Sequence, residues 1–295
     1  MDDYVISCCS TADISEEHFR DRGLQYICFH YVMNGKEYTD DLGKTITFQE
    51  FYKAMRCGAA TRAVSIRAEE FERYFDSFLQ KGQDVLHVCL SSGISDVIRS
   101  AMTARNRLEE RYPERKIFIL DSFGASSGYG LFMDRLAELR AEGKTIDELY
   151  DWARANRLKL HHWFFSTDLD FYVRSGSVSK TAGFVGGVLG LCPLLNVDNR
   201  GRLIPRDRIH TKKKAIAELV KRMEEYAADG LNYSGKCYIS QSACYGDARE
   251  VADRIEERFP KLDGGVEINT IGTTVGSHTG PGTVALFFWG NDRTE

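Results

Sequence analysis

The first half of the chain alternates short apolar runs with helical patterns, and this alternation limits the fold more than any other feature. Its clearest unit is the apolar run Val85–Leu90, followed by a helical pattern from Asp96 to Glu110 and a second run, Lys116–Leu120. Such runs are typical of the middle of a parallel sheet. Tyr26–Val32 is expected to form a further single strand. The alternation predicts a doubly wound parallel sheet that binds ligands beyond the carboxyl ends of its strands.

The second half of the chain mixes strands and helices without strict alternation. A strand is expected at Leu160–Phe165 and an amphipathic helix at Lys212–Ala228. This mixture is typical of an α+β domain. The sequence therefore predicts an α/β protein of two domains, a parallel α/β domain over residues 1–157 and a mixed α+β domain over residues 158–295.

The composition is that of an ordinary globular protein. Of the 295 residues, 43% are hydrophobic and 28% are charged, and the net charge is −4. This balance supports large cores and indicates no general affinity for nucleic acid. No apolar run reaches the length of a membrane span, so no stable membrane insertion is expected. The start, Met1–Asp3, lacks the features of a signal peptide, which predicts a cytoplasmic location.

Neither a metal nor a nucleotide cofactor is expected from the sequence. The eight cysteines include no C-x-x-C pair, and their apolar surroundings predict buried free thiols. His161 and His162 are neighbours on an expected strand and would point to opposite faces, so they cannot share a metal ion. Glycine-rich phosphate loops of the Walker or Rossmann type are absent from the sequence.

A glycine-rich segment near the C-terminus, Gly276–Gly282, stands between two expected buried strands, Val266–Ile271 and Thr283–Phe288. Glycine allows sharp turns and close approach to a bound group. The segment predicts a tight turn that presents the imidazole of His278 and the hydroxyl of Thr279 at fixed positions. The alternative is a plain strand connection whose histidine only satisfies a backbone carbonyl.

Hydroxyl groups follow the central strand of the predicted parallel sheet. The loop Ser91–Ser95 leads into a helix, whose first amide groups and dipole favour an anion. A site built from Thr61, Ser92, the Gly93 amide and His278 would suit a carboxylate or phosphate oxygen. Helix capping alone is an equal alternative for Ser91 and Ser92, and Ser95 is predicted to be the N-cap.

Several segments together resemble the DegV family, which is similar throughout to the fatty-acid-binding subunit of bacterial fatty acid kinase. The resemblance extends from Val5 to Phe288, and its most specific parts are the Ser-Ser-Gly loop and the Ser-His-Thr-Gly-Pro-Gly segment. The segments that carry it are Ser10–Asp13, Leu90–Ser95, Asp121–Ser122, Arg174–Gly176 and Gly276–Gly282.

The resemblance implies two α/β domains with a long-chain fatty acid between them and no further cofactor. The carboxylate of the fatty acid would be held by Thr61, Ser92 and the Gly93 amide, with His278 and Thr279 nearby. In the kinase version, a separate ATP-using partner phosphorylates the bound carboxylate to an acyl phosphate. The chain itself would then be a lipid-binding protein or a non-catalytic subunit and not an enzyme.

One departure from the family concerns the possible kinase partner. His210 stands where the family commonly has arginine, and a basic residue there is expected to matter for phosphoryl transfer or partner docking. The change bears on the kinase partnership rather than on ligand binding. Candidates for the lining of an acyl-chain cavity, with plain core packing as the alternative, are Phe164, Phe165, Phe184, Val185, Val188 and Leu189.

Two other functions fit the same residues. The chain could be a stand-alone acyl hydrolase or transferase that uses Ser92 and His278, although the G-x-S-x-G motif of many such enzymes is absent. It could also carry another small carboxylate or phosphate, for which a short or polar cavity would be expected.

Overall fold

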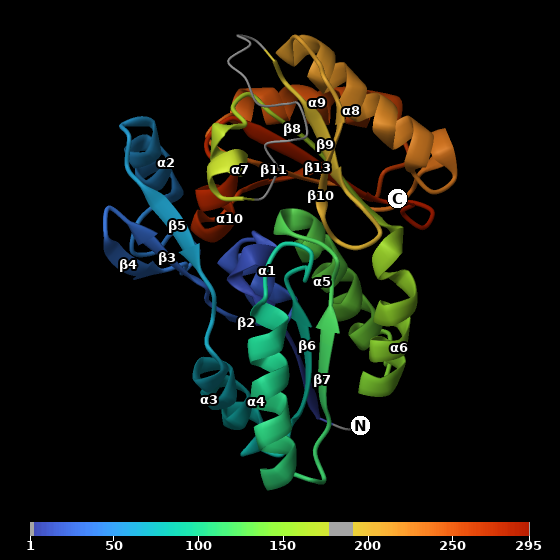
Figure 1. Ribbon diagram of the computed structural model, residues 1–295. Helices are drawn as coiled ribbons and strands as arrows, with labels where there is room; N and C mark the ends of the chain where they lie inside the picture. The colour runs from blue at the N-terminus through green and yellow to red at the C-terminus, as the bar shows by residue number, and fades with distance from the viewer. Residues whose placement is uncertain (1–2, 177–190, 295) are drawn as a thin grey trace.

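The computed structural model describes residues 3–176 and 191–294, and its strands form three sheets (Figure 1). The first sheet is parallel, with the order β2-β1-β6-β7. The second is mixed, with the order β10-β9-β8-β13-β11-β12, and the third is a small antiparallel sheet, β4-β3-β5. The parallel sheet and the mixed sheet confirm the predicted α/β fold class. The third sheet was not predicted.

The elements have the following bounds. The strands are β1 (Tyr4–Cys9), β2 (Gln25–Ile27), β3 (His30–Met33), β4 (Lys36–Thr39), β5 (Thr61–Val64), β6 (Asp84–Cys89), β7 (Ile117–Asp121), β8 (Leu160–Ser166), β9 (Leu194–Val197), β10 (Leu203–Asp207), β11 (Tyr238–Gln241), β12 (Glu267–Thr270) and β13 (Thr283–Trp289). The α-helices are α1 (Glu16–Asp21), α2 (Phe48–Arg56), α3 (Ala68–Leu79), α4 (Val97–Arg111), α5 (Ser126–Ala141), α6 (Ile146–Asn156), α7 (Asp170–Arg174), α8 (Lys212–Tyr226), α9 (Tyr245–Arg258) and α10 (Thr273–Thr279). Short 3-10 helices are η1 (Ser10–Ala12), η2 (Arg157–Lys159) and η4 (Gly230–Asn232).

The strand order of the first sheet creates a switch point between β1 and β6. From β1 the chain adds β2 on one side, and from β6 it adds β7 on the other. The segments that leave these two central strands, η1 and the loop 91–95, therefore start side by side at the carboxyl edge of the sheet. Ligands of open α/β sheets bind at such a switch point.

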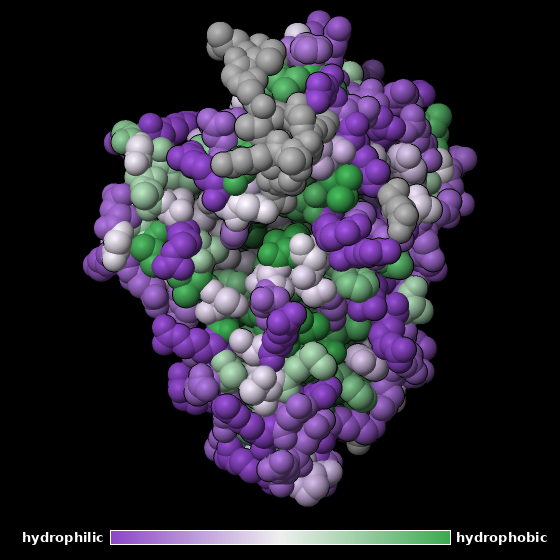
Figure 2. All heavy atoms as spheres, in the orientation of Figure 1, coloured by the Kyte–Doolittle hydropathy of each residue, from purple (hydrophilic) through white to green (hydrophobic). Residues whose placement is uncertain are grey.

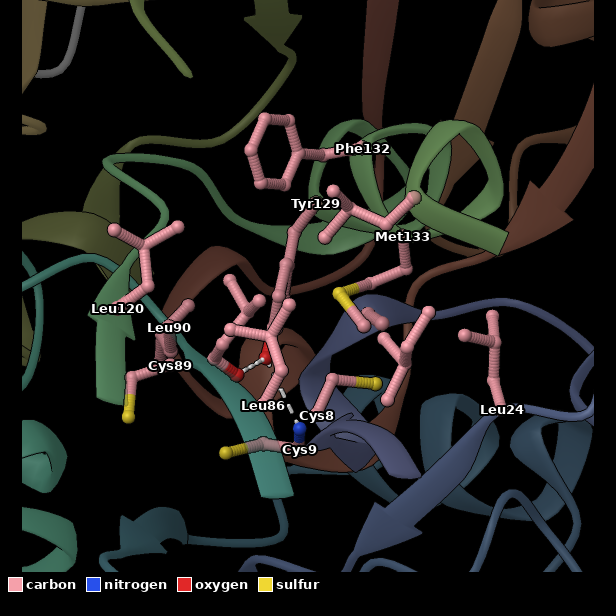
Figure 3. Packing of buried hydrophobic residues seen from close by; sticks show 14 of the residues in the cluster. Cys8, Cys9, Leu24, Leu86, Cys89, Leu90, Leu120, Tyr129, Phe132 and Met133 are labelled. Carbon is pink, nitrogen blue, oxygen red and sulfur yellow. Dashed lines mark hydrogen bonds between the residues drawn. The ribbon is translucent and has the colours of Figure 1, made fainter. Parts of the chain in front are cut away.

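Tyr129 of α5 ties the helix to the two central strands of the first sheet (Figure 3). Its hydroxyl accepts a hydrogen bond from the Cys9 amide at 3.1 Å and donates to the Val88 carbonyl. Around it pack buried apolar side chains, including Cys8, Leu86 and Met133. Because a buried hydroxyl without partners would be costly, these bonds fix α5 over the edge where the ligand is expected.

The second sheet has two buried faces, which the alternation of side chains along its strands separates. Phe164 on β8 and Phe287 on β13 belong to the core shared with the first sheet, whereas Phe165 and Leu286 belong to the core under α8 and α9. Figure 1 shows α8 and α9 on the side of this sheet away from the first sheet. Successive residues of a strand point to opposite faces, so adjacent phenylalanines serve different cores.

The prediction of one strand over Tyr26–Val32 was wrong. The chain forms β2 in the parallel sheet, leaves it at Cys28 and Phe29, and continues as β3 in the small sheet. Phe29 is buried in the main core, and its amide donates to the Ser10 hydroxyl at 3.0 Å. Tyr31 is buried instead in a separate small cluster with Phe51 of α2. The segment divides because its aromatic side chains fill two cores.

The first strand of the second sheet, β8, begins at Leu160, directly after η2. The division into domains at residues 1–157 and 158–295 remains a prediction. Within residues 3–176 and 191–294, no helix combines the length and apolar character that crossing a bilayer would require. In that same part of the chain, no three His, Cys, Asp or Glu side chains are arranged to hold a metal ion.

Candidate ligand-binding site

A cavity of about 240 Å³ lies between the carboxyl edge of the first sheet and the inner face of the second. Figure 2 shows green, apolar atoms in the hollow between the two halves of the molecule. Sites for drug-sized ligands span about 300–1,000 Å³. A cavity slightly below that range suits one slender ligand better than a bulky one.

Apolar side chains from both halves form most of the cavity wall. Strands β8 and β13 pair in register, so that Phe164 stands opposite Ala285 and both face the cavity. Leu90 and Ile94 approach from the end of β6. Val197 and Leu203 complete this wall from β9 and β10. The small side chain of Ala285 leaves room beside Phe164 that a larger residue would fill.

Helix α10 supplies three polar side chains that line the cavity, Thr274, His278 and Thr279. His278 is partly buried, and desolvation lowers the pKa of its imidazole below the ordinary value. The ring is therefore uncharged at neutral pH, with one nitrogen that donates and one that accepts.

The prediction of a tight turn at Gly276–Gly282 was wrong, because most of this segment is helical. Helix α10 starts after Gly272 and ends at Gly280, whose φ of +66° lies in the left-handed region that glycine adopts readily. At Gly276 an added Cβ would lie 2.5 Å from the Tyr52 hydroxyl. The glycines thus let a helix pack closely against α2 rather than form a turn.

A buried carboxylate from a distant part of the chain holds the first turn of α10. Asp40, 1% exposed, accepts from the Thr273 hydroxyl at 2.8 Å and from the Thr274 amide at 3.2 Å. Asp13 is also buried and accepts from the Ser126 hydroxyl at 2.5 Å. Burial raises the pKa of both carboxyl groups. Since α10 has only two turns, this anchoring fixes where His278 lies.

Three serines that the sequence analysis did not select as ligand-binding residues line the cavity, Ser65, Ser95 and Ser126. Ser65 directly follows β5, the strand against which α10 packs, and Ser95 ends the loop after β6. Helix α4 begins at Val97 with Asp96 as its N-cap, so the prediction of Ser95 as N-cap was wrong by one residue. The Ser95 hydroxyl still accepts from the Val97 amide at 3.3 Å, which leaves its proton available to a ligand.

The structure places Thr61, Ser92 and Gly93 in the predicted segments but not among the described residues that line the cavity. Ala63 of β5 lines the cavity. Thr61 lies two residues before Ala63, on the same face of the strand, but does not line the cavity. Ser92 is exposed, and its amide donates to Asp121. A contact between these three residues and a ligand remains a prediction.

The shape of the loop 91–95 explains why its last residues, rather than its middle, line the cavity. The Ser91 hydroxyl donates to the Gly201 carbonyl at 2.7 Å, and a Cβ at Gly93 would lie 2.5 Å from the same carbonyl. The middle of the loop is therefore pressed against the β9–β10 turn. Ile94 and Ser95 follow and reach the cavity.

The predicted chain-lining residues separate into three groups. Phe164 lines the cavity, and Phe165 packs on the opposite face of the second sheet. The roles of Phe164 and Phe165 remain predictions. His210, the residue predicted for phosphoryl transfer or partner docking, is exposed two residues before α8, and its role also remains a prediction. The other predicted lining residues, Phe184, Val185, Val188 and Leu189, lie outside the described residues.

Residues 6–291 match the family described as an uncharacterised protein, DegV family. A DegV domain-containing protein of Clostridium perfringens is 31% identical over 293 residues, which are 99% of each chain. This chain belongs to the DegV family. A second DegV domain-containing protein, from Streptococcus pyogenes serotype M1, is 28% identical over 98% of this chain and 99% of its own length. The resemblance seen in the sequence is thereby confirmed.

Solved structures of DegV proteins share the fold over nearly the whole chain. A fatty-acid-binding DegV protein of Thermus thermophilus has a TM-score of 0.85 at 23% identity, covering 98% of this chain and 99% of its own. A stearic-acid-binding protein of Eubacterium ventriosum has a TM-score of 0.86 at 21% identity, with 96% and 97% covered. The fatty acid kinase (Fak) B3 protein of Streptococcus pneumoniae, loaded with linoleic acid, has a TM-score of 0.82 at 18% identity, with 99% and 100% covered.

Proposed function

We propose that this DegV protein binds a long-chain fatty acid in the cavity between its two sheets. The observation that carries the proposal is a largely apolar cavity of about 240 Å³, bordered by a helix that presents the polar side chains of His278 and Thr279. The fatty acids bound by the similar Thermus thermophilus and Eubacterium ventriosum proteins support the same class of ligand.

The acyl chain contributes most of the binding free energy in this proposal. Each buried methylene contributes about 0.8 kcal/mol, so ten of them contribute about 8 kcal/mol before the cost of association. A hydrogen bond to a charged group contributes about 1.5–3 kcal/mol. The length and shape of the cavity therefore select the chain, while the polar groups orient the acid.

The carboxylate lies at the end of the cavity bordered by α10 and β5. There, the His278 imidazole and the hydroxyls of Ser65 and Ser95 act as donors to its oxygens. The Thr279 hydroxyl, which donates to the Gly280 carbonyl at 3.3 Å, would turn its proton to the ligand to do the same. An uncharged imidazole can donate through one nitrogen without the cost of burying a further charge. No bond in the ligand is broken by these groups, so the chain acts as a binding protein rather than as an enzyme, without a cofactor.

A separate ATP-dependent kinase is the partner that we propose for this complex, on the basis of the fold shared with the Fak B3 protein. It would phosphorylate the presented carboxylate, and the exposed residue His210 before α8 lies in the segment proposed for docking. A cytoplasmic location, where ATP is available, is part of the same proposal.

Calorimetric titration of lipid-stripped protein with a matched pair of ligands tests the binding proposal. We expect saturable binding of hexadecanoic acid with one site per chain. Hexadecan-1-ol, which has the same chain but no carboxylate, should bind about tenfold or more weakly, since it loses at least one charge-assisted hydrogen bond. Failure of both ligands to bind would refute the proposal, and equal affinities would refute the assigned headgroup contacts.

A further inference from the structure

A second pocket, of about 270 Å³, lies on the outer face of the second sheet, away from the ligand cavity. Side chains of β8, β9, β10 and α8 line it together with the C-terminal segment. In Figure 1 the C-terminal end of the chain lies beside the β9–β10 hairpin. One water needs only about 10–15 Å³ of such space, so the pocket has room for a small ligand.

Three residues that line this pocket each carry a buried N–H group that makes no hydrogen bond within the described part of the protein. These groups are the Trp163 indole Nε1, the Arg222 Nε and the Arg293 Nε. Trp163 and Arg293 are 4% and 5% exposed. Buried donors in folded proteins are almost always bonded, to the protein, to water or to a ligand. Three missing acceptors around one pocket indicate a ligand that accepts hydrogen bonds.

Arg293 forms no ion pair with a carboxylate among the described residues. Its guanidinium donates to three backbone carbonyls, those of Val197 at 3.2 Å, Phe123 at 2.8 Å and Arg157 at 3.4 Å. Two carboxylates, Asp198 and Asp121, act on it electrostatically. Asp198 is bonded to Arg202, and Asp121 accepts from the backbone amides of Ser92 and Phe123. Burial lowers the pKa of Arg293 to about 10, and it stays charged at neutral pH. A buried cation of this kind calls for an anion.

The other charged groups around the pocket leave this excess of positive charge in place. Arg222 is compensated through its terminal nitrogens, which pair with Asp207 at 2.7 Å, Glu218 at 2.8 Å and Glu225 at 2.9 Å. Arg206 also lines the pocket, and its Nε donates to the Asn196 amide oxygen at 2.8 Å. Asp207 is the one acidic residue among the described residues that line the pocket, and its carboxylate faces Arg222.

We propose that this pocket is a second binding site, which takes a small oxyanion such as a phosphate group. Arg293 supplies a positive charge without an ion-pair partner, and the Nε–H groups of Arg293 and Arg222 and the indole N–H of Trp163 supply donors. An oxyanion matches them because its several oxygens can accept bonds from different directions. This site is separate from the proposed fatty acid site and does not depend on it.

Titration of the full chain with inorganic phosphate, at constant ionic strength in chloride, tests this proposal by calorimetry. We expect saturable binding to the wild-type protein. Trp163→Phe keeps the aromatic packing and removes one donor, so it should weaken phosphate binding about tenfold. Arg293→Gln should abolish it. Glycerol phosphate and acetate, titrated in parallel, show whether the site accepts phosphate esters or carboxylates as well as free phosphate.

Arg254→Gln is the matched control, since it removes one positive charge from α9, outside the pocket. Its phosphate affinity should equal that of the wild type. If Arg293→Gln does not fold, Trp163→Phe decides the question. Absence of saturable binding to the wild type would overturn the proposal. The proposal would also be overturned if Trp163→Phe, or every variant, bound phosphate as tightly as the wild type does, because the phosphate would then bind elsewhere.

Discussion

At the scale of single residues, the proposed site depends on side chains that the chain brings together from distant segments. His278 and Thr279 could be selected from the sequence because glycines flank them. Ser65 and Ser95 could not, since an isolated serine after a strand has the same appearance whether it caps a helix or meets a ligand. What decides is the direction of each side chain, which depends on how β5 and the loop 91–95 pack in the folded protein.

The first residue-scale prediction concerns His278. His278→Gln removes the imidazole but keeps a side chain that can donate one hydrogen bond from a different position. We expect its affinity for hexadecanoic acid to fall about tenfold, while its affinity for hexadecan-1-ol falls much less, because the change affects the carboxylate end. Titration of both ligands measures this. Equal losses for the acid and the alcohol would show that His278 acts on the cavity in general.

At the scale of elements, helix α10 was the largest error of the sequence analysis. Its seven residues include Gly276, and glycine lowers helix propensity by about 1 kcal/mol relative to alanine. Such a short helix forms because Asp40, more than 230 residues earlier in the chain, binds its first turn. The residues around α10 do not indicate the contact with Asp40, so their glycines alone predict a turn.

Gly276→Ala tests the close packing of α10 on α2. The new Cβ would lie 2.5 Å from the Tyr52 hydroxyl and 3.1 Å from the Phe51 ring, so α10 has to move. We expect a loss of about 1–3 kcal/mol in the free energy of unfolding together with weaker fatty acid binding. Urea denaturation and ligand titration measure the two effects.

Two further variants serve as controls for Gly276→Ala. Gly246→Ala, on α9, meets nothing within 4 Å, and it should leave stability unchanged or raise it. Tyr52→Phe removes the hydroxyl that the new Cβ would meet. Combined with Gly276→Ala, it should recover part of the lost ligand affinity. Tyr52→Phe alone is measured as well, because the Tyr52 hydroxyl donates to the Ile271 carbonyl at 2.8 Å. If Gly276→Ala lowers affinity as much in the Tyr52→Phe background as in the wild type, the contact with the Tyr52 hydroxyl is not the cause.

The alternation along β13 gives a second element-scale prediction. Ala285 faces the cavity, so Ala285→Leu places a larger side chain where the acyl chain is proposed to lie. We expect hexadecanoic acid to bind at least about tenfold more weakly, with little change in stability, since the added atoms enter empty space.

Ala252→Leu, in the core under α9, is the converse of Ala285→Leu. It overfills a packed interior and should cost about 1–3 kcal/mol of stability without changing the affinity of the folded protein. If Ala285→Leu binds the fatty acid as the wild type does, the chain lies elsewhere.

At the scale of the whole molecule, buried histidines make stability depend on pH. Burial lowers the pKa of His87 to about 3 and that of His161 to about 4, from an ordinary value of 6.5. Between about pH 6.5 and pH 4, the unfolded chain binds protons at these positions and the folded chain does not. Each therefore removes about 1.4 kcal/mol of stability per pH unit as the pH falls through this window.

The difference between variants isolates this effect, because the raised pKa values of Asp13 and Asp40 act in the opposite direction. His87→Gln should lose less stability than the wild type between pH 6 and pH 4, by about 1.4 kcal/mol per unit. Ser7→Ala removes the hydrogen-bond partner of His87, 2.9 Å away, and keeps the imidazole. Its pH slope, measured by urea denaturation, should match that of the wild type. Equal slopes for His87→Gln and the wild type would contradict the account.

Much of the architecture could be predicted from the sequence, since runs such as Val85–Leu90 can only be buried in the middle of a sheet. The small sheet β4-β3-β5 could not, because its strands are short and partly exposed and Tyr26–Val32 reads as one continuous strand. The cavity itself arises where two separately predictable sheets meet. Its size depends on how closely they pack, and no local pattern encodes that distance.

Mass spectrometry of the lipid released when the purified protein is denatured tests the central claim most directly. The account predicts a long-chain fatty acid in an amount close to one per chain, and a clearly smaller amount from Ala285→Leu purified in the same way. Protein that releases no fatty acid, and takes none up after incubation with a mixture of long-chain fatty acids, would contradict it.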